Sequence, residues 1–237
     1  MGRQVKSKQR VADHGEVFTA EREVNAMLDL VKQETERIDS RFLEPACGDG
    51  NFLVEILRRK LAVVKSKYRK SPADYEQNAV LAVTSIYGVD ILQDNVEACR
   101  ERLFQMWGKE YTANCKKETS DACREAVRYI LRRNILCGNA LTMVKVDEAG
   151  QDTEEPIVFS EWSFVTGALL KRSDYRLDVL LSENPQDEMY DMQFSLFGDD
   201  VANNQNWVID PVTHQRMPKP IREYPAIHYR RVQEYGE

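Results

Sequence analysis

The sequence has no apolar run that approaches the length of a membrane span, and its first residues, MGRQVKSK, lack the apolar region of a secretory signal. Its five cysteines are an odd number, and no two of them have C-x-x-C spacing. This pattern argues against a zinc site and a disulfide framework, and it fits a reducing compartment. We therefore expect a cytoplasmic protein with no membrane segment and no metal site.

The chain also lacks an excess of positive charge. Its 33 Lys and Arg residues are outnumbered by 39 Asp and Glu residues, which gives a formal net charge of −6. Such a protein has no overall field that attracts nucleic acid, so contact with DNA must come from local patches or from a partner. The 42% apolar content is sufficient for a core, and 237 residues suit one domain or one domain with an extension.

In the first part of the chain, segments with the apolar pattern of a strand alternate with segments that have the apolar pattern of a helix, which predicts an α/β order of elements. A helix is expected to begin at Thr19, which suits an N-cap, and to run to about Asp39. Strands are expected over 41–45, 86–90 and 134–141. Helices are expected from Asn51 onward, over 93–107 and over 115–133. Residues 65–78 are charged and read as a surface excursion.

The character of the sequence changes after Asp147. Residues 147–155 are acidic and rich in turn formers, which favours a boundary there. Strands are expected over 156–165 and 175–181, and residues 182–220 are turn-rich. We therefore predict a core with an N-terminal helix over residues 1–146, and a C-terminal extension with strands and an irregular basic and aromatic tail over residues 147–237.

The segment Glu44-Pro-Ala-Cys-Gly-Asp-Gly-Asn-Phe52 carries the main chemical signal. Gly48 and Gly50 allow a tight turn after a strand and the close approach of a ligand to the backbone. The following helix presents free N–H groups that suit a carboxylate or phosphate. Asp90, at the end of the second strand, is placed to accept hydrogen bonds from ribose hydroxyls. Considered without the other motifs, Asp90 could equally be an aspartate that stabilises the turn after the strand.

Glu44–Phe52 resembles the cofactor-binding motif of S-adenosylmethionine-dependent DNA methyltransferases of the adenine-N6 kind, which occur in restriction–modification systems. Three further segments resemble motifs of this family in the same order: 14–19 (HGEVFT), 87–91 (YGVDI) and 138–141 (GNAL). The resemblance covers roughly the first 60% of the chain. It implies a Rossmann-like class I methyltransferase core, complete or incomplete, with a turn-rich C-terminal extension.

The resemblance also implies a cofactor site. The glycine turn and Thr19 would bind the amino acid end of S-adenosylmethionine, whereas Asp90, Ile91 and Asn139 would bind the adenosine end. Cys47 would contribute its backbone rather than its thiol, and His14 is interpreted as a loop histidine. The full set of implied cofactor-binding residues is Phe18, Thr19, Glu44, Ala46, Cys47, Gly48, Asp49, Gly50, Phe52, Asp90, Ile91, Asn139, Ala140 and Leu141.

The sequence departs from the family at the catalytic motif. Amino-methylating members carry an Asn/Asp/Ser-Pro-Pro-aromatic tetrad after the fourth strand, which binds the target amine and stacks on the extruded base. This sequence has no Pro-Pro dipeptide. The two partial matches are 159–162 (FSEW) and 184–187 (NPQD), and neither has all parts of the motif. The sequence therefore does not identify the catalytic residues.

Several functions are consistent with these observations. The first is a DNA adenine-N6 methyltransferase, or its cofactor-binding part, that binds DNA alone or with a second subunit supplying the catalytic loop and target recognition. The second is a degenerate module that binds cofactor or a partner and transfers nothing. A weaker alternative is methylation of RNA or protein, because the cofactor motifs do not specify the acceptor.

The last part of the sequence, residues 216–231, interleaves basic and aromatic side chains. Such a pattern can contact a nucleic-acid backbone and stack on bases. It can equally be an extended segment that packs over the domain or docks on a partner. We favour packing or docking, because single runs of charge are usually solvated faces.

Overall fold

The computed structural model describes residues 9–10, 16, 19–182, 206–209 and 216–236. At its centre is a parallel sheet with the strand order β1-β2-β3. These strands are β1 (Phe42–Glu44), β2 (Ile86–Asp90) and β3 (Ile135–Cys137). Every residue of β2 is buried, as expected for the middle strand of a parallel sheet. The three strands lie within the segments predicted from the sequence, and the α/β fold class is confirmed.

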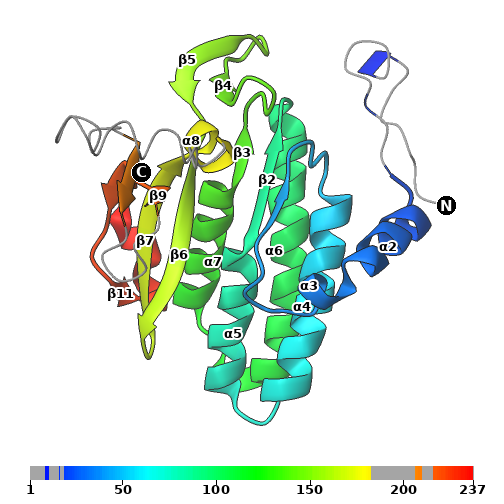
Figure 1. Cartoon of the computed structure of the whole chain (residues 1–237). Helices are drawn as coiled ribbons and strands as arrows, with labels where there is room; N and C mark the ends of the chain where they lie inside the picture. The colour runs from blue at the N-terminus through cyan, green and yellow to red at the C-terminus, as the bar shows by residue number, and fades with distance from the viewer. Residues whose placement is uncertain (1–8, 11–15, 17–18, 183–205, 210–215, 237) are drawn as a thin grey trace.

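Long helices of the described part pack beside this sheet (Figure 1). They are α4 (Asn51–Tyr68), α5 (Pro72–Thr84), α6 (Gln93–Cys115) and α7 (Asp121–Asn134), with the short 3-10 helix η1 (Lys116–Glu118) between the last two. Two of the helix starts follow sequence rules. The Ser71 hydroxyl accepts the Asp74 N–H at 3.4 Å next to a proline at the first helical position, and the Ser120 hydroxyl accepts the Cys123 N–H at 3.4 Å.

The predicted surface excursion over residues 65–78 is wrong. α4 continues to Tyr68 and α5 begins at Pro72, so most of this segment is helical. Tyr75 is fully buried, as is the apolar stripe that follows it in α5. The segment looked like a loop because most of its charged residues lie on the solvent side of two amphipathic helices.

The N-terminal helix differs from its prediction in both its start and its length. It comprises α2 (Glu21–Leu30) and α3 (Lys32–Thr35), separated at Val31, whose φ of −116° and ψ of 32° are not helical. Ala20 rather than Thr19 is the N-cap, and its backbone N–H donates to the Glu23 carboxylate at 3.3 Å. Only Val24 and Leu28 of the apolar stripe are buried, so a shorter helix is sufficient to cover the available surface.

α6 extends beyond its predicted end at Trp107 to Cys115, and the next helix starts only at Asp121. The reason is aromatic packing inside the helical layer. Trp107 and Tyr111 are fully buried, and their rings stack with centroids 4.5 Å apart. Each buried ring adds apolar contact that favours continuation of the helix.

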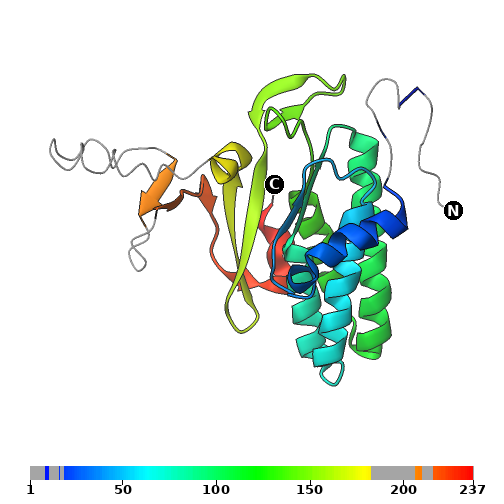
Figure 2. The same cartoon turned by 45° about the vertical axis from the view of Figure 1, so that its right-hand side comes forward.

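The C-terminal part is mainly antiparallel. Its elements are β4 (Val144–Val146), β5 (Asp152–Pro156), β6 (Val158–Thr166), β7 (Leu169–Arg176), α8 (Leu177–Leu181), β8 (Trp207–Ile209), β9 (Arg216–Pro218), β10 (Arg222–Glu223), β11 (Ile227–His228) and η2 (Tyr229–Tyr235). Figure 2 shows β6 and β7 on one side of the central sheet and α4, α5 and α6 on the other. The strand predicted over 156–165 is confirmed as β6.

The second half of the acidic segment 147–155 belongs to β5, which pairs with β4. One prediction for this part is wrong. The segment 175–181 is mostly α8 rather than a strand, because β7 ends at Arg176 and its guanidinium pairs with Asp178 in the first helical turn. Burial of Leu177 and Val179 then anchors this short helix.

The tail packs on the domain, as we favoured from its sequence. β10 and β11 both pair antiparallel with β7, and η2 packs against α7. Trp162, Leu170 and Tyr229 lie in the same core cluster as the long helices. No helix in the described residues has the length and apolarity that would carry it across a bilayer.

Candidate functional site

The glycine turn lies between the end of β1 and the start of α4. Gly48 has φ of 53° and Gly50, the N-cap of α4, has φ of 94°, a conformation that side-chain-bearing residues rarely adopt. A Cβ atom on Gly50 would lie 2.7 Å from the Cys99 sulfur. Gly50 is therefore required by backbone conformation and by close packing, independently of any ligand.

Asp90 connects the end of β2 to this turn. One carboxylate oxygen accepts the Gly48 N–H at 2.9 Å, and the other accepts the Leu92 N–H at 2.9 Å and the Asn95 amide at 3.1 Å. The Asp90 side chain therefore holds the turn in place. Because a carboxylate offers about four acceptor positions, these bonds leave capacity for a further donor.

The N-terminal segment reaches the same place. The Glu16 carboxylate accepts the Asn95 amide at 2.7 Å, and Arg10 pairs with both Glu16 and Asp94 at 2.6 Å. Asn95 therefore joins the N-terminal segment to Asp90. Sequence reasoning missed Arg10, Glu16 and Asn95, because no local pattern shows that residues so far apart in the chain meet here.

Thr19 and Asn51 form a second connection to the turn. The Asn51 amide donates to the Thr19 carbonyl at 3.1 Å. The predicted contact residue Phe18, and His14, lie outside the described residues. Of the predicted 14–19 motif, the structure thus places Glu16 and Thr19 beside the glycine turn.

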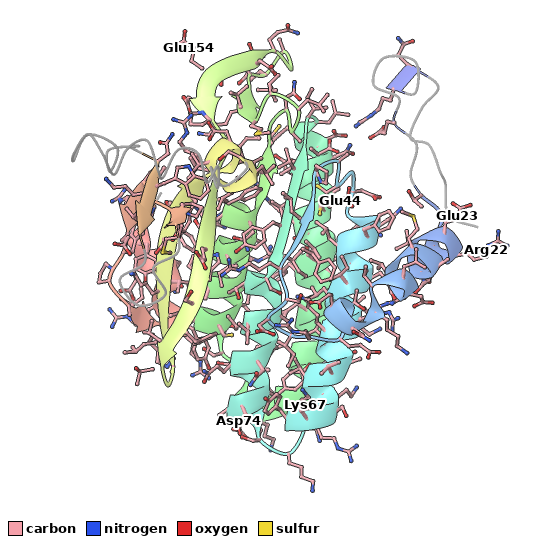
Figure 3. The ribbon with its side chains drawn as sticks, viewed as in Figure 1. Arg22, Glu23, Glu44, Lys67, Asp74 and Glu154 are labelled. Carbon is pink, nitrogen blue, oxygen red and sulfur yellow. The ribbon has the colours of Figure 1, made fainter. Side chains whose placement is uncertain are left out.

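Glu44 ends β1 at the same edge of the sheet (Figure 3). Burial raises the pKa of its carboxyl, and a hydrogen bond from the Ala46 backbone acts in the opposite direction. Figure 3 shows Glu44 toward the end of the molecule that carries Glu154 of β5, whereas Lys67 and Asp74 lie at the opposite end. No basic side chain of the described residues pairs with Glu44, so its partly buried carboxylate is a suitable place for a cationic group of a ligand.

Arg102 of α6 binds residues of the glycine turn. Its guanidinium donates to the Asp49 carbonyl at 2.8 Å and to the Asn51 side-chain oxygen at 3.0 Å, and it pairs with the Asp49 carboxylate at 2.7 Å. The Asp49 side chain is therefore directed to Arg102. Sequence reasoning did not identify Arg102, because it lies in the middle of a helix with no motif around it.

Cys47 is buried in the turn. A hydrogen bond with Cys99 and burial raise the pKa of its thiol far above the usual range. The thiol is therefore not a nucleophile at neutral pH. This agrees with an interpretation in which the backbone of Cys47 matters more than its sulfur.

The third predicted motif lies after β3. The Asn139 side chain donates to the Asp152 carboxylate at 3.0 Å and accepts the Leu141 N–H at 3.0 Å, so it ties the end of β3 to the β4–β5 hairpin. Leu141 is 92% exposed. Ile91, Phe52 and Ala140 are half-buried. The structure thus brings Glu44, the glycine turn, Asp90 and Asn139 to the carboxyl edge of one parallel sheet, where ligands bind in such folds.

The partial tetrad at 159–162 does not form an acceptor site. Residues 159–162 lie inside β6 rather than in a loop. Ser160 donates to Asp174, and the Trp162 indole donates to Asn134 in the core, so this ring cannot stack on a base. Residues 184–187 lie outside the described residues.

The arrangement can bind a ligand that combines a cationic end with hydroxyl groups, through Glu44, backbone N–H groups and Asp90. Among the described residues there is no cluster of three or more His, Cys, Asp or Glu side chains that could hold a metal ion.

Comparisons with known proteins agree with this geometry. A family model described as the DNA-methyltransferase domain of MmeI matches residues 17–167. DNA methyltransferase A of Bacillus subtilis is 24% identical over 147 residues, which is 59% of this chain and 16% of that protein. A putative type II restriction enzyme and methyltransferase of Methanocaldococcus jannaschii is 29% identical over 104 residues, which is 43% of this chain and 8% of that protein. No solved structure matches significantly. The chain thus spans less than a fifth of the length of these relatives.

Proposed function

Because this chain belongs to the family of MmeI-type DNA-methyltransferase domains, we propose that it binds S-adenosylmethionine at the carboxyl edge of the β1–β3 sheet and serves methylation of adenine N6 in DNA. The observation that carries the proposal is the convergence of Glu44, the glycine turn and Asp90 at one sheet edge. The motif order that resembles adenine-N6 enzymes supports the choice of acceptor.

The proposed binding mode follows from the chemistry of the cofactor. S-adenosylmethionine carries a positive sulfonium and an ammonium group, and the partly buried Glu44 carboxylate would offset this charge. Backbone N–H groups at the start of α4 would bind its carboxylate. Asp90 would accept hydrogen bonds from the ribose hydroxyls while it keeps its bond to the Gly48 N–H.

The cofactor supplies an electrophilic methyl group when it is bound, and this chain's residues bind and orient it. Asn139 would contact adenine at the end of β3, and its bond to Asp152 would fix the orientation of its amide. Phe18 and Ile91 are proposed as apolar contacts. The acceptor side is less complete, since the sequence has no Pro-Pro dipeptide and the 159–162 segment is buried in β6.

Calorimetric titration of the purified chain with S-adenosylmethionine and with S-adenosylhomocysteine tests the binding site. Glu44→Gln should weaken binding of S-adenosylmethionine by about 10- to 100-fold, because a hydrogen bond to a charged group contributes about 1.5–3 kcal/mol. Glu154→Gln is the matched control, because Glu154 is an exposed glutamate on β5, and its affinity should equal that of the unmodified chain. Equal losses in both variants, or no loss in either, would contradict the assignment.

A transfer assay with tritiated methyl groups tests the acceptor. Unmethylated DNA, RNA and a protein mixture are offered separately, and the methylated nucleoside is identified by mass spectrometry. N6-methyladenine in DNA is the expected product. Tight cofactor binding without transfer to any acceptor would favour the non-catalytic module, which the missing tetrad also favours.

A further inference from the structure

Asn95 is a buried asparagine in the first turn of α6, and it contacts Asp90. Its amide nitrogen donates to Oδ1 of Asp90 at 3.1 Å and to Oε1 of Glu16 at 2.7 Å. Its amide oxygen accepts a hydrogen bond from the Arg10 guanidinium at 3.4 Å. Because the nitrogen faces two carboxylates and the oxygen faces a cation, a single orientation of the amide satisfies all three contacts. The direction of the Asn95 side chain is therefore fixed.

The bonds made to Asp90 leave its two carboxylate oxygens with unequal capacity. Oδ1 accepts the Leu92 N–H at 2.9 Å and the Asn95 amide, so both of its acceptor positions are in use. Oδ2 accepts the Gly48 N–H at 2.9 Å and, among the bonds made by the described residues, no other donor. The acceptor position that remains for a ligand hydroxyl is therefore on Oδ2, the oxygen bonded to the glycine turn.

Glu16 brings a second negative charge to the same amide. Since the oxygens of Glu16 and Asp90 both bind the Asn95 nitrogen, they lie within about 6 Å of each other, a range in which like charges repel. The two bonds from the Asn95 amide and the pairing of Arg10 with Glu16 at 2.6 Å offset this repulsion. Without the amide, we expect the Asp90 carboxylate to turn away from Glu16 and to lose its fixed direction.

Asn134 shows what a buried asparagine does in this fold when it has only a structural role. It directly precedes β3 and is fully buried. Its amide donates to the carbonyls of Thr84 and Ile86 at 3.3 and 3.1 Å, and its oxygen accepts the Trp162 indole N–H at 2.9 Å. These partners lie at the amino end of the sheet or in the core. Asn95 differs because one of its partners is the carboxylate proposed to bind the ligand.

We propose that Asn95 is a positioning residue for Asp90, and that through it the site selects ligands with intact ribose hydroxyls over the corresponding deoxy ligands. The proposal rests on the proposed function, in which Asp90 binds the ribose. A ribose hydroxyl that reaches Oδ2 meets an acceptor that is already directed toward it. This fixed direction favours binding, because the carboxylate does not have to be ordered when the ligand arrives.

Calorimetric titration of the full chain with S-adenosylhomocysteine and with its 2′-deoxy and 3′-deoxy analogues tests this role. The unmodified chain should bind at least one analogue about 10-fold more weakly than the parent compound, because a hydrogen bond to a charged group is lost. Asn95→Leu keeps the approximate size of the side chain and removes its amide. It should reduce this ratio to about 3-fold or less, because Oδ2 is no longer held in place.

Asn134→Leu is the matched control, since it removes a buried amide that also makes three hydrogen bonds. Both leucine variants should lower the temperature of thermal unfolding, but Asn134→Leu should keep the full ratio between parent compound and analogue. An unchanged ratio in Asn95→Leu would overturn the proposal. An equal decrease of the ratio in both variants would do the same, because it would trace the effect to general loosening of the fold.

A second variant tests the contact if Asn95→Leu does not fold. Glu16→Ala removes one of the two carboxylates that orient the Asn95 amide, at a position closer to the surface. It should reduce the ratio about 2-fold or more, because the amide is then less strictly oriented. Glu154→Ala, at the exposed glutamate of β5, should leave the ratio unchanged. Equal ratios in these two variants would overturn the proposal.

A double-mutant cycle distinguishes positioning from a separate structural contribution. If Asn95 acts through Asp90, then Asn95→Leu should cause no further loss of affinity for S-adenosylhomocysteine in a chain that already carries Asp90→Ala. A further loss as large as that in the unmodified chain would overturn the proposal.

The same titrations separate this proposal from the proposed function. If the unmodified chain binds neither S-adenosylmethionine nor S-adenosylhomocysteine, both fail. If it binds S-adenosylhomocysteine and the two deoxy analogues with equal affinity, cofactor binding stands and selection through Asp90 is overturned.

Discussion

The glycine turn and the polar cluster of β7 use similar side chains for different purposes. In β7, Arg172 and Asp174 form a bidentate pair with side chains 0% and 6% exposed, and Ser160 and Tyr129 complete it. At the turn, Asp49 and Arg102 are 26% and 39% exposed. The buried cluster is closed by its own partners, whereas the turn keeps one side accessible. Closed networks specify a fold, and partly open ones are suited to a ligand.

The largest expected effect breaks the buried cluster. Asp174→Ala leaves the buried Arg172 guanidinium without its carboxylate, which should cost about 3–5 kcal/mol of unfolding free energy. Asp178→Ala is the matched control, because Asp178 pairs with Arg176 at the surface of the same region and is 39% exposed. It should cost about 1 kcal/mol or less. Urea denaturation measures both, and similar losses would remove the distinction between closed and open networks.

An intermediate effect is expected on affinity rather than stability. Asp90→Ala should weaken S-adenosylmethionine binding by about 1–3 kcal/mol, because it removes the proposed ribose acceptor and the bond that holds Gly48. Asp74→Ala, an exposed aspartate at the opposite end of the molecule, serves as control. Calorimetry on folded protein gives both affinities. A loss of a few tenths of a kcal/mol or less for Asp90→Ala would reduce its role to that of a turn residue.

The smallest effect, expressed per pH unit, concerns Lys60, which is fully buried and donates to the Ile38 carbonyl at 3.2 Å. Burial lowers its pKa to about 7. The unfolded chain, with a lysine pKa of about 10.4, therefore binds more protons between about pH 7 and 10, and stability should rise with pH in that window. The expected slope is at most about 1.4 kcal/mol per pH unit, and it should vanish below about pH 7 where both states are protonated.

Urea denaturation between pH 7 and 9.5 tests this slope. Lys60→Met should abolish it, whereas Lys67→Met, at an exposed lysine near the end of α4, should retain it. A slope that persists unchanged in Lys60→Met would assign the pH dependence to another group.

The reliable sequence signals were local ones. The three parallel strands, the glycine turn and the helix that begins at Asn51 each depend on a few neighbouring residues with strong preferences. The two segments whose structure was predicted wrongly share one physical cause. Residues 65–78 and 175–181 carry mixed polarity, and only their burial against other elements shows that they are helical.

The sequence by itself determined the order of the α/β elements, the left-handed turn that needs Gly48 and Gly50, and the polar residues that end β1 and β2. Only the tertiary structure decided that Arg10, Glu16 and Asn95 meet at Asp90 and that Trp162 is a core residue. The physical reason is the distance along the chain over which each interaction acts. Backbone preferences and caps act between neighbouring residues, whereas pairing, burial and open edges depend on segments that the chain brings together only when it folds.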